Sequence, residues 1–191
     1  MPKAKDDKKI EAIFGATLKL VLKDGFSGLR MSDVAKEARI ATGTLYIYFR
    51  DKHELINELY LSLKKKSIDS YVDPADMNLP IKKAFDTVWK KYFLNTLQNP
   101  EETAFIEQYY RSPFLKVKVK EEAYQLLTPI YQLLERGKKE QLIKHVDNDL
   151  LIAQISGPIA EIVRMHQAGG LRVNDSIMKD ALQLAWDSVK K

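Results

Sequence analysis

Apolar residues recur at intervals of three and four positions along almost the whole sequence, and this spacing constrains the fold more than any other feature. In the first segment, positions 10, 13, 14, 17, 18 and 21 all carry an apolar residue or threonine. At 3.6 residues per turn, these positions lie on one face of a helix. The period-two alternation that indicates strands is not found. The spacing therefore predicts an all-α protein of about nine helices.

Turn and capping residues divide the chain into a three-helix head and a larger C-terminal helical bundle. Gly25-Phe26 predicts the end of the first helix. Short helices are expected over roughly 32–38 and 42–48, and Asp51-x-x-Glu54 forms a capping box that opens the next helix. A linker follows at 73–80. Longer helices are predicted at roughly 80–98, 101–111, 116–138, 148–168 and 174–190, which gives a head over 1–67 and a bundle over 68–191.

The positive charge of the chain is concentrated at one end. Residues 1–66 contain 14 Lys and Arg against 9 Asp and Glu, whereas residues 67–191 contain 17 of each. A basic segment joined to a neutral one indicates that the first has a polyanionic partner. On charge alone, a chance excess of surface lysines explains the asymmetry equally well.

The sequence lacks the features of several classes of protein. It has no cysteine, which excludes disulfide scaffolds, thiolate zinc sites, iron–sulfur clusters and cysteine nucleophiles. No run approaches 18 apolar residues, and the first nine residues lack an apolar signal core, so we expect a cytoplasmic protein. The three histidines lack metal-ligand spacing, and no common catalytic motif occurs. We therefore expect no enzyme activity, no metal and no cofactor.

The segment MSDVAKEARIATGTLYIYF, at residues 31–49, predicts a helix-turn-helix. Two short helices are joined by a turn of about three residues, and the small side chain of Ala35 allows their backbones to approach closely. The core of this motif is expected to contain Val34, Ile40, Leu45 and Phe49. The other face of the second helix is then free to enter a DNA major groove, where hydroxyl and methyl groups contact base edges. That face is predicted to carry Thr42, Thr44, Tyr46 and Ile47.

Residues of about 7–67 resemble the DNA-binding domain of TetR-type transcriptional regulators. The resemblance rests on an amphipathic first helix that ends in Gly-Phe, on the string G-T-L-Y-x-x-F at residues 43–49, and on Lys52, which opens the fourth helix. The larger C-terminal part fits the same family by its length and its helical character.

The resemblance implies which residues bind DNA. The positions that usually contact DNA are occupied by Thr42, Thr44, Tyr46, Tyr48 and Lys52, and Ser32 falls on a variable position that often reads a base. In addition, Gly43 would let the helix backbone approach the sugar-phosphate wall. The Lys52 ammonium and nearby backbone N–H groups are expected to bind one phosphate together. For Tyr46 and Tyr48, an ordinary apolar helix end is the alternative.

Three residues depart from the family pattern. Arg39 replaces a turn glycine, which costs about 1 kcal/mol if the backbone there is left-handed. Arg30 and Ala41 replace hydroxyl residues that commonly cap the two helices of the motif, and each lost cap is worth about 1 kcal/mol. Arg30 and Arg39 would instead add phosphate contacts.

The C-terminal part is rich in aromatic residues, most of which we expect to fill its core. Such a bundle is also a setting for an apolar ligand pocket. Pro129 and Pro158 fall inside helical patterns, where each is expected to kink its helix and open space. We therefore expect a pocket near these two prolines. The candidate ligand-binding residues are Trp89, Phe93, Phe105, Tyr109, Tyr124, Tyr131, Met165 and His166.

The last two predicted helices carry wide apolar faces, which include Leu150, Ile155 and Ile162 on one helix and Ile177 and Leu184 on the other. Two such helices from each chain, paired across a two-fold axis, would form the four-helix interface by which the family dimerises. The same faces could instead pack within one chain.

The resemblance implies a homodimeric repressor that a small apolar molecule releases from its double-stranded operator. Two alternatives stay open. A constitutive DNA-binding protein without an effector would have a filled bundle. A helical binding protein or enzyme that carries the same head would bind or convert a ligand without any change in its affinity for DNA.

Overall fold

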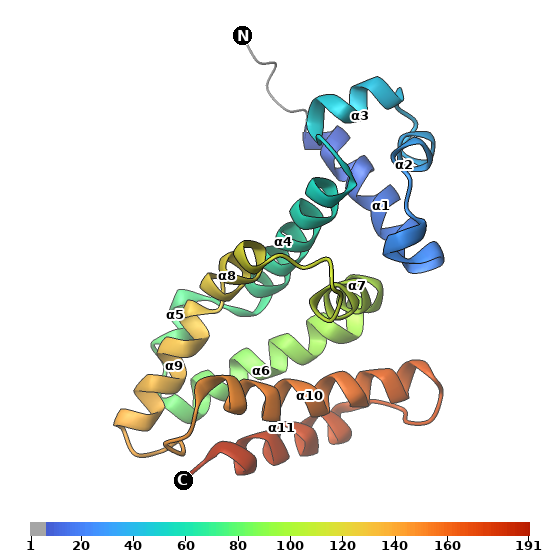
Figure 1. The fold of residues 1–191 in the computed structure, drawn as a ribbon. Helices are drawn as coiled ribbons and strands as arrows, with labels where there is room; N and C mark the ends of the chain where they lie inside the picture. Colours follow the sequence, from blue (N-terminus) through green and yellow to red (C-terminus); the bar gives the residue numbers. More distant parts are fainter. Residues whose placement is uncertain (1–6) are drawn as a thin grey trace. The chain divides into compact units, whose positions relative to one another are not determined.

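The computed structural model describes residues 7–191, and within this range the chain is all-α (Figure 1). Of the lysines that make the N-terminal segment basic, Lys3 and Lys5 lie outside the described residues. The helices are α1 (Asp7–Gly28), α2 (Met31–Glu37), α3 (Thr42–Tyr48), α4 (Lys52–Tyr71), α5 (Pro74–Met77), α6 (Ile81–Gln98), α7 (Pro100–Tyr110), α8 (Val117–Gln125), α9 (Thr128–Lys139), α10 (Asn148–Gln167) and α11 (Asp175–Val189).

The chain divides into two compact units, each with its own core. Unit 1 consists of residues 1–64 and 100–123, and unit 2 consists of residues 65–99 and 124–191. The division falls inside α4 and α8, so both helices contribute to both units. The boundary expected at residue 67 lies close to the first division. No signal in the sequence indicated that residues 100–123 would group with the N-terminal helices.

Unit 1 is built around the amphipathic helix α1, which packs against α2 and α7. Its helical backbone is interrupted at Gly25, where φ is +73°, and the next residue, Phe26, packs against two aromatic rings of α7. The ring centroids are 5.6 Å apart for Phe26 and Phe105, and 5.2 Å apart for Phe26 and Tyr109. The Tyr109 hydroxyl donates a hydrogen bond of 2.5 Å to Oδ1 of Asn57 in α4. These contacts tie α7 to the first and fourth helices.

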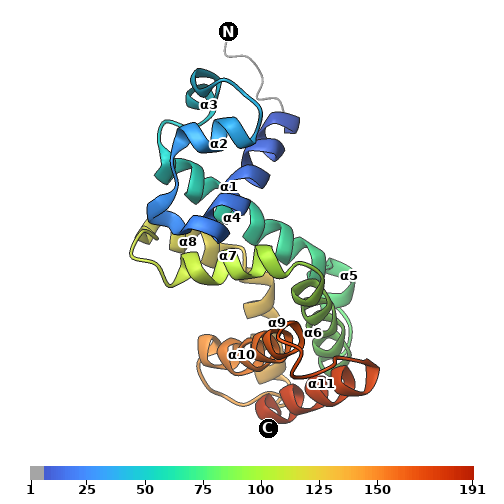
Figure 2. The ribbon, with the colours of Figure 1, turned by 90° about the vertical axis from the view of Figure 1, so that its right-hand side faces the viewer.

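Unit 2 packs α6 against α5, α9, α10 and α11, and α10 and α11 run side by side in both views (Figures 1 and 2). Phe85 lies at the centre of its core, stacked on Trp89 with ring centroids 4.5 Å apart and in edge contact with Trp186 at 5.1 Å. Large aromatic pairs of this kind contribute about 0.5–1.5 kcal/mol beyond the burial of their area. The expectation that most aromatic residues fill the core holds for these three.

The single helix predicted over 116–138 is two helices in the structure. Helix α8 ends at Gln125 and α9 begins at Thr128, so Pro129 stands in the first turn of a new helix, where its missing N–H is not needed. Gly137 lies inside α9. A Cβ atom there would come within 2.4 Å of Ile143 Cδ1. Glycine is therefore required at this position by close packing rather than by a turn.

Candidate nucleic-acid interface and apolar pocket

Helices α2 and α3 form the predicted helix-turn-helix, and a few apolar residues fix their packing. Val34, Ala35 and Leu45 are buried with at most 1% of their surface exposed, and Phe49 is buried beside Phe14 of α1, with ring centroids 5.8 Å apart. The Ile40 N–H donates to the Ala35 carbonyl at 2.9 Å, which closes the turn. The residues predicted for this core are thus confirmed as buried, except that Ile40 is half-buried.

The turn between α2 and α3 has the backbone strain expected from its sequence. Arg39 has a φ of +57°, in the left-handed region that favours glycine, and this conformation costs about 1 kcal/mol for a residue with a Cβ. Arg30 and Ala41 occupy the N-cap positions of the two helices, and neither side chain makes a capping hydrogen bond. The three departures from the family pattern therefore carry the structural costs predicted for them.

Leu45 of α3 and its C-cap residue Phe49 are buried, and they mark the side of the helix that faces the core. The opposite side is the outward face of α3. At about 100° per residue, Gly43 and Ile47 each lie about 160° from Leu45 around the helix, so both face away from its buried side. Ile47 is 79% exposed, and Gly43 contributes no side chain to this face. A Cβ atom built at Gly43 would meet nothing within 4 Å, so packing within the chain does not require glycine there.

The other predicted DNA-binding residues lie on or beside α3. Thr42 is exposed at its first position, Tyr46 is 52% exposed, and Thr44 and Tyr48 are half-buried on its flanks. Ser32 is exposed in the first turn of α2. By helical spacing, Thr44 and Tyr46 flank Ile47 on the outward face of α3, whereas Thr42 and Tyr48 lie at the two ends of the helix and Ser32 lies on α2.

Lys52 lies at the first position of α4, where the predicted capping box is present. The Glu54 N–H donates to Oδ1 of Asp51 at 2.9 Å, and the Arg50 N–H donates to Oε2 of Glu54 at 2.5 Å. The hydrogen bond from the Glu54 N–H lowers the pKa of the Asp51 carboxyl. Because the Asp51 carboxylate occupies this helix terminus, the ammonium of Lys52 is left as the group that can reach a phosphate. That ammonium lies 3.4 Å from the Ser27 carbonyl oxygen.

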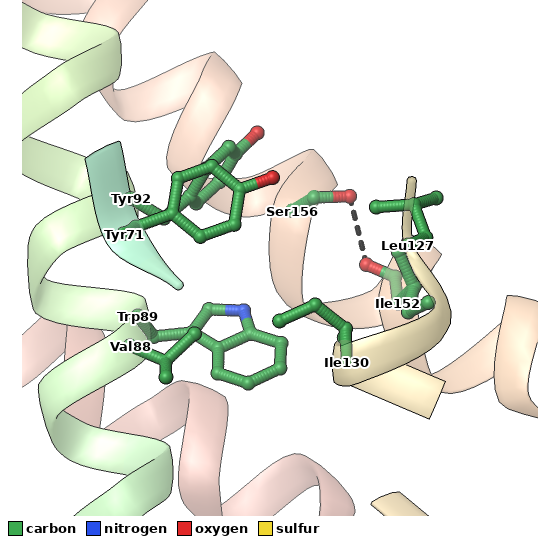
Figure 3. A pocket seen from close by; sticks show the side chains of 8 residues that line it. All are labelled: Tyr71, Val88, Trp89, Tyr92, Leu127, Ile130, Ile152 and Ser156. Carbon is green, nitrogen blue, oxygen red and sulfur yellow. Dashed lines mark hydrogen bonds between the residues drawn. The ribbon is translucent and has the colours of Figure 1, made fainter. Parts of the chain in front are cut away.

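Unit 2 contains a small apolar pocket between α4, α6, α9 and α10 (Figure 3). The cavity itself is about 40 Å³, and the space reaches about 310 Å³ only when the open solvent at its mouth is included. None of its lining residues carries a charge. Among its polar groups, the Ser156 hydroxyl donates to the Ile152 carbonyl at 2.7 Å, and burial raises the pKa of the Tyr71 hydroxyl, which keeps this phenol neutral. The pocket is lined by Tyr71, Val88, Trp89, Tyr92, Leu127, Ile130, Ile152 and Ser156.

Of the eight candidate ligand-binding residues, Trp89 lines this pocket. Phe105 and Tyr109 belong to the core of unit 1, and Phe93 is fully buried in the core of unit 2. The others lie elsewhere in unit 2. The Tyr131 hydroxyl donates to Oδ1 of Asp149 at 2.5 Å, Met165 is 38% exposed, Nδ1 of His166 accepts from the Val173 N–H at 3.3 Å, and Tyr124 begins the second segment of the unit.

The pocket lies near Pro129 and Pro158, as expected, whereas most of the predicted aromatic residues do not line it. Leu127 and Ile130, which flank Pro129, line the pocket, and so does Ser156, two residues before Pro158 in α10. The spacing of residues 88, 89 and 92 on α6 also indicates one helix face. The sequence analysis does not include Tyr71, because α4 begins in the predicted head and runs past the boundary expected at residue 67.

Within residues 7–191, no group of three or more His, Asp or Glu side chains could hold a metal ion.

None of the helices in the described part of the chain combines the length and the apolar character needed to cross a membrane.

A helix-turn-helix with an exposed second helix, joined to a second helical unit with its own core, defines a DNA-binding regulator. Two family models match the chain. The model described as "Bacterial regulatory proteins, tetR family" matches residues 13–59, and that described as "Tetracyclin repressor-like, C-terminal domain" matches residues 80–190. The chain belongs to the TetR family of bacterial transcriptional regulators.

Individual relatives support this assignment along the chain. An HTH-type transcriptional regulator of Haemophilus influenzae is 31% identical over 116 residues, which cover 61% of this chain and 62% of that protein. The HTH-type regulator YdeS of Bacillus subtilis is 26% identical over 97% of this chain and 92% of its own. The crystal structure of a TetR family regulator from Marinobacter aquaeolei VT8 aligns over 98% of both chains with a TM-score of 0.91 and 26% identity. These relatives are named as regulators rather than enzymes.

Replacing Gly43 with Ala is expected to separate the stability of the fold from contact with DNA. Nothing in the chain obstructs the added methyl group, and Ala is the better helix former, so the free energy of unfolding should rise by up to about 1 kcal/mol in urea denaturation. The same methyl group should weaken DNA binding, because it stands on the outward face of α3. Gly15→Ala, in an open and exposed position of α1, is the control and should raise stability alone. Unchanged DNA affinity in Gly43→Ala would contradict close approach of this face.

Proposed function

We propose that the protein is a homodimeric repressor that binds a pseudo-palindromic operator through α3 and leaves it when a small apolar molecule occupies unit 2. The outward face of α3 is the observation that carries this proposal, because it leaves a recognition helix uncovered within a helix-turn-helix of the TetR family. Since the partner is DNA, we place the protein in the cytoplasm.

The contacts to DNA follow from the position of each group. Exposed hydroxyls at the start of α2 and α3 suit base edges or phosphates, and the tyrosine hydroxyls and the Lys52 ammonium suit phosphates. Direct base contacts would give specificity, whereas phosphate contacts would fix the register of the helix on the duplex. The proposed set is Ser32, Thr42, Gly43, Thr44, Tyr46, Tyr48 and Lys52.

Dimerisation is proposed through α10 and α11, which expose large apolar side chains although they pack against each other. Leu150 and Met165 of α10 are 59% and 38% exposed, and Leu184 of α11 is 69% exposed. Their buried faces, with Ile155 and Trp186, already serve the core of unit 2. A second copy that covers the exposed faces would place two α3 helices on one DNA duplex.

The pocket of unit 2 favours a ligand-responsive regulator over a constitutive one. Its lining of aromatic and aliphatic side chains without a charge suits a small, uncharged apolar molecule, because a buried ion without a partner costs several kcal/mol. Tyr71 at the end of α4 lines the pocket, and Lys52 at the start of the same helix lies in the DNA-binding segment. We propose that a ligand with different affinity for two positions of α4 shifts the population away from the DNA-binding state.

Binding to DNA from the region upstream of its own gene, titrated with salt against a scrambled fragment, tests the regulator assignment. Tight binding with a preference for the genuine fragment is expected. In Lys52→Ala, log K should fall less steeply with the logarithm of the salt concentration. The slope should become less negative by about 0.9 for each protomer, because one phosphate contact is lost. Lys179→Ala, an exposed lysine of α11, should leave the slope unchanged. Equal binding to both fragments would contradict regulation at this site.

Closing the pocket should abolish the binding of an apolar ligand without abolishing the binding of DNA. The half-buried Ser156 faces the pocket, and Phe at this position would fill it. With 1-octanol as the probe, the melting temperature of the unchanged protein should rise, and that of Ser156→Phe should not. Ser176→Phe, at an exposed position of α11, is the control and should still respond. An equal rise in both variants would place the binding site elsewhere.

A charge on the proposed dimer face should separate the protomers. Leu184→Glu places a carboxylate at the exposed face of α11, and sedimentation should show a monomer whose operator affinity is strongly reduced. Leu142→Glu, at a 43% exposed apolar position after α9, should leave the protein dimeric. A dimer that survives Leu184→Glu with its affinity unchanged would exclude this residue from the interface.

A further inference from the structure

Ile47 is the side chain that stands at the centre of the outward face of α3. It lies two residues after the buried Leu45 and so points about 160° away from it, and Phe49, two residues later, is buried as well. Its flanks are formed by Tyr46 on one side and the half-buried Thr44 on the other. A β-branched apolar residue that is 79% exposed cannot stabilise the core of unit 1. Its role has to be sought outside the chain.

The chemistry of the DNA major groove limits what an isoleucine can face. Guanine and adenine present acceptors there, adenine and cytosine present amino groups, and thymine presents one acceptor and the 5-methyl group. An isoleucine side chain neither donates nor accepts a hydrogen bond. Against guanine, adenine or cytosine it would strip water from polar groups without replacing their hydrogen bonds. The thymine methyl group is the partner that loses nothing by this contact.

We propose that Ile47 reads a thymine in each half-site of the operator by packing against its 5-methyl group. This inference rests on the proposed function, in which α3 enters the major groove, and it adds a specificity residue that acts through apolar contact. The hydroxyl-bearing residues Thr42 and Thr44 then read polar base edges or phosphates on either side of it.

The surroundings of Ile47 on α3 favour such a contact. Gly43 lies one turn earlier on the same face and has no side chain, so the helix can approach the bases closely enough for Ile47 to reach them. The branched Cβ of Ile47 restricts its χ1 rotamers in a helix, and little freedom is lost on binding. Burying one methyl group changes a binding constant about fourfold, so two half-sites should give about fifteenfold.

An exposed apolar residue without a function is the competing explanation, and the chain offers a matched example. Val117 at the start of α8 is also β-branched, is 73% exposed and belongs to the same unit. It lies outside the helix-turn-helix. Val117→Ala therefore serves as the control for Ile47→Ala, and both variants should unfold at the same urea concentration as the unchanged protein.

The test uses the full chain and DNA duplexes that it selects from a random pool. Each thymine of the selected duplex is replaced in turn by deoxyuridine, which removes the 5-methyl group and leaves every hydrogen-bonding group in place. One symmetry-related pair of replacements should weaken binding about fifteenfold. In Ile47→Ala the same replacement should have no effect, because the contact is already lost, whereas Val117→Ala should behave as the unchanged protein does.

Three results would overturn the inference. The selected duplexes could lack a recurrent thymine, no deoxyuridine replacement could weaken binding, or Ile47→Ala could lose as much affinity on replacement as the unchanged protein. If no sequence is enriched at all, the proposed function itself fails, and the role of Ile47 fails with it. A normal selection with unaffected deoxyuridine duplexes would leave the regulator assignment intact and remove Ile47 alone.

Discussion

The burial of Leu45 and Phe49 determines how the rest of this protein can act on DNA. Both residues come from the same short stretch of chain, and both are held in the core that α1, α2 and α4 supply. A seven-residue helix is too short to be stable alone, so its position depends on this packing. Once these two side chains are fixed, the opposite face of α3 must point outward. The orientation of a recognition helix is thus a consequence of hydrophobic packing rather than of any polar contact.

Hydrophobic packing also determines the character of the pocket in unit 2. The core of this unit combines large aromatic rings, most of them from α6, with a larger number of aliphatic side chains from the surrounding helices. The pocket lies where the two kinds of side chain meet, with Trp89 and the two tyrosines on one part of its wall and Leu127, Ile130 and Ile152 on another (Figure 3). Since no charged group lines it, an occupant would be held by shape and burial of apolar surface.

The sequence was sufficient to predict the helix-turn-helix and most of the residues in its core. The helix-turn-helix has strong local signals: a capping box at Asp51 and Glu54, and apolar spacing that identified Val34, Leu45 and Phe49 as core. For Arg39, the left-handed backbone was suggested by the resemblance, because the family usually has a turn glycine at this position. Such features depend on neighbours within a few positions, so a single sequence contains them.

Features that depend on distant parts of the chain were not predictable in the same way. Phe105 and Tyr109 were assigned to a ligand pocket, yet they pack in unit 1 beside Phe26, a contact that spans about 80 positions of sequence. Pro129 fits a kinked helix and a new helix equally well, and only tertiary packing decides between them. Ile47 had been placed on the open face of α3, but its isolation at the centre of that face became clear only from its exposure and from the empty space at Gly43.

The most direct measurement of the central claim is a crystal structure of the protein bound to a DNA duplex that it selects. The account predicts a two-fold symmetric dimer with one α3 helix in each of two major-groove segments, about 34–36 Å apart or a multiple of that distance. Gly43 and Ile47 should face the bases, with Lys52 beside a phosphate. A complex in which α3 points away from the duplex, or in which another surface holds the DNA, would contradict it.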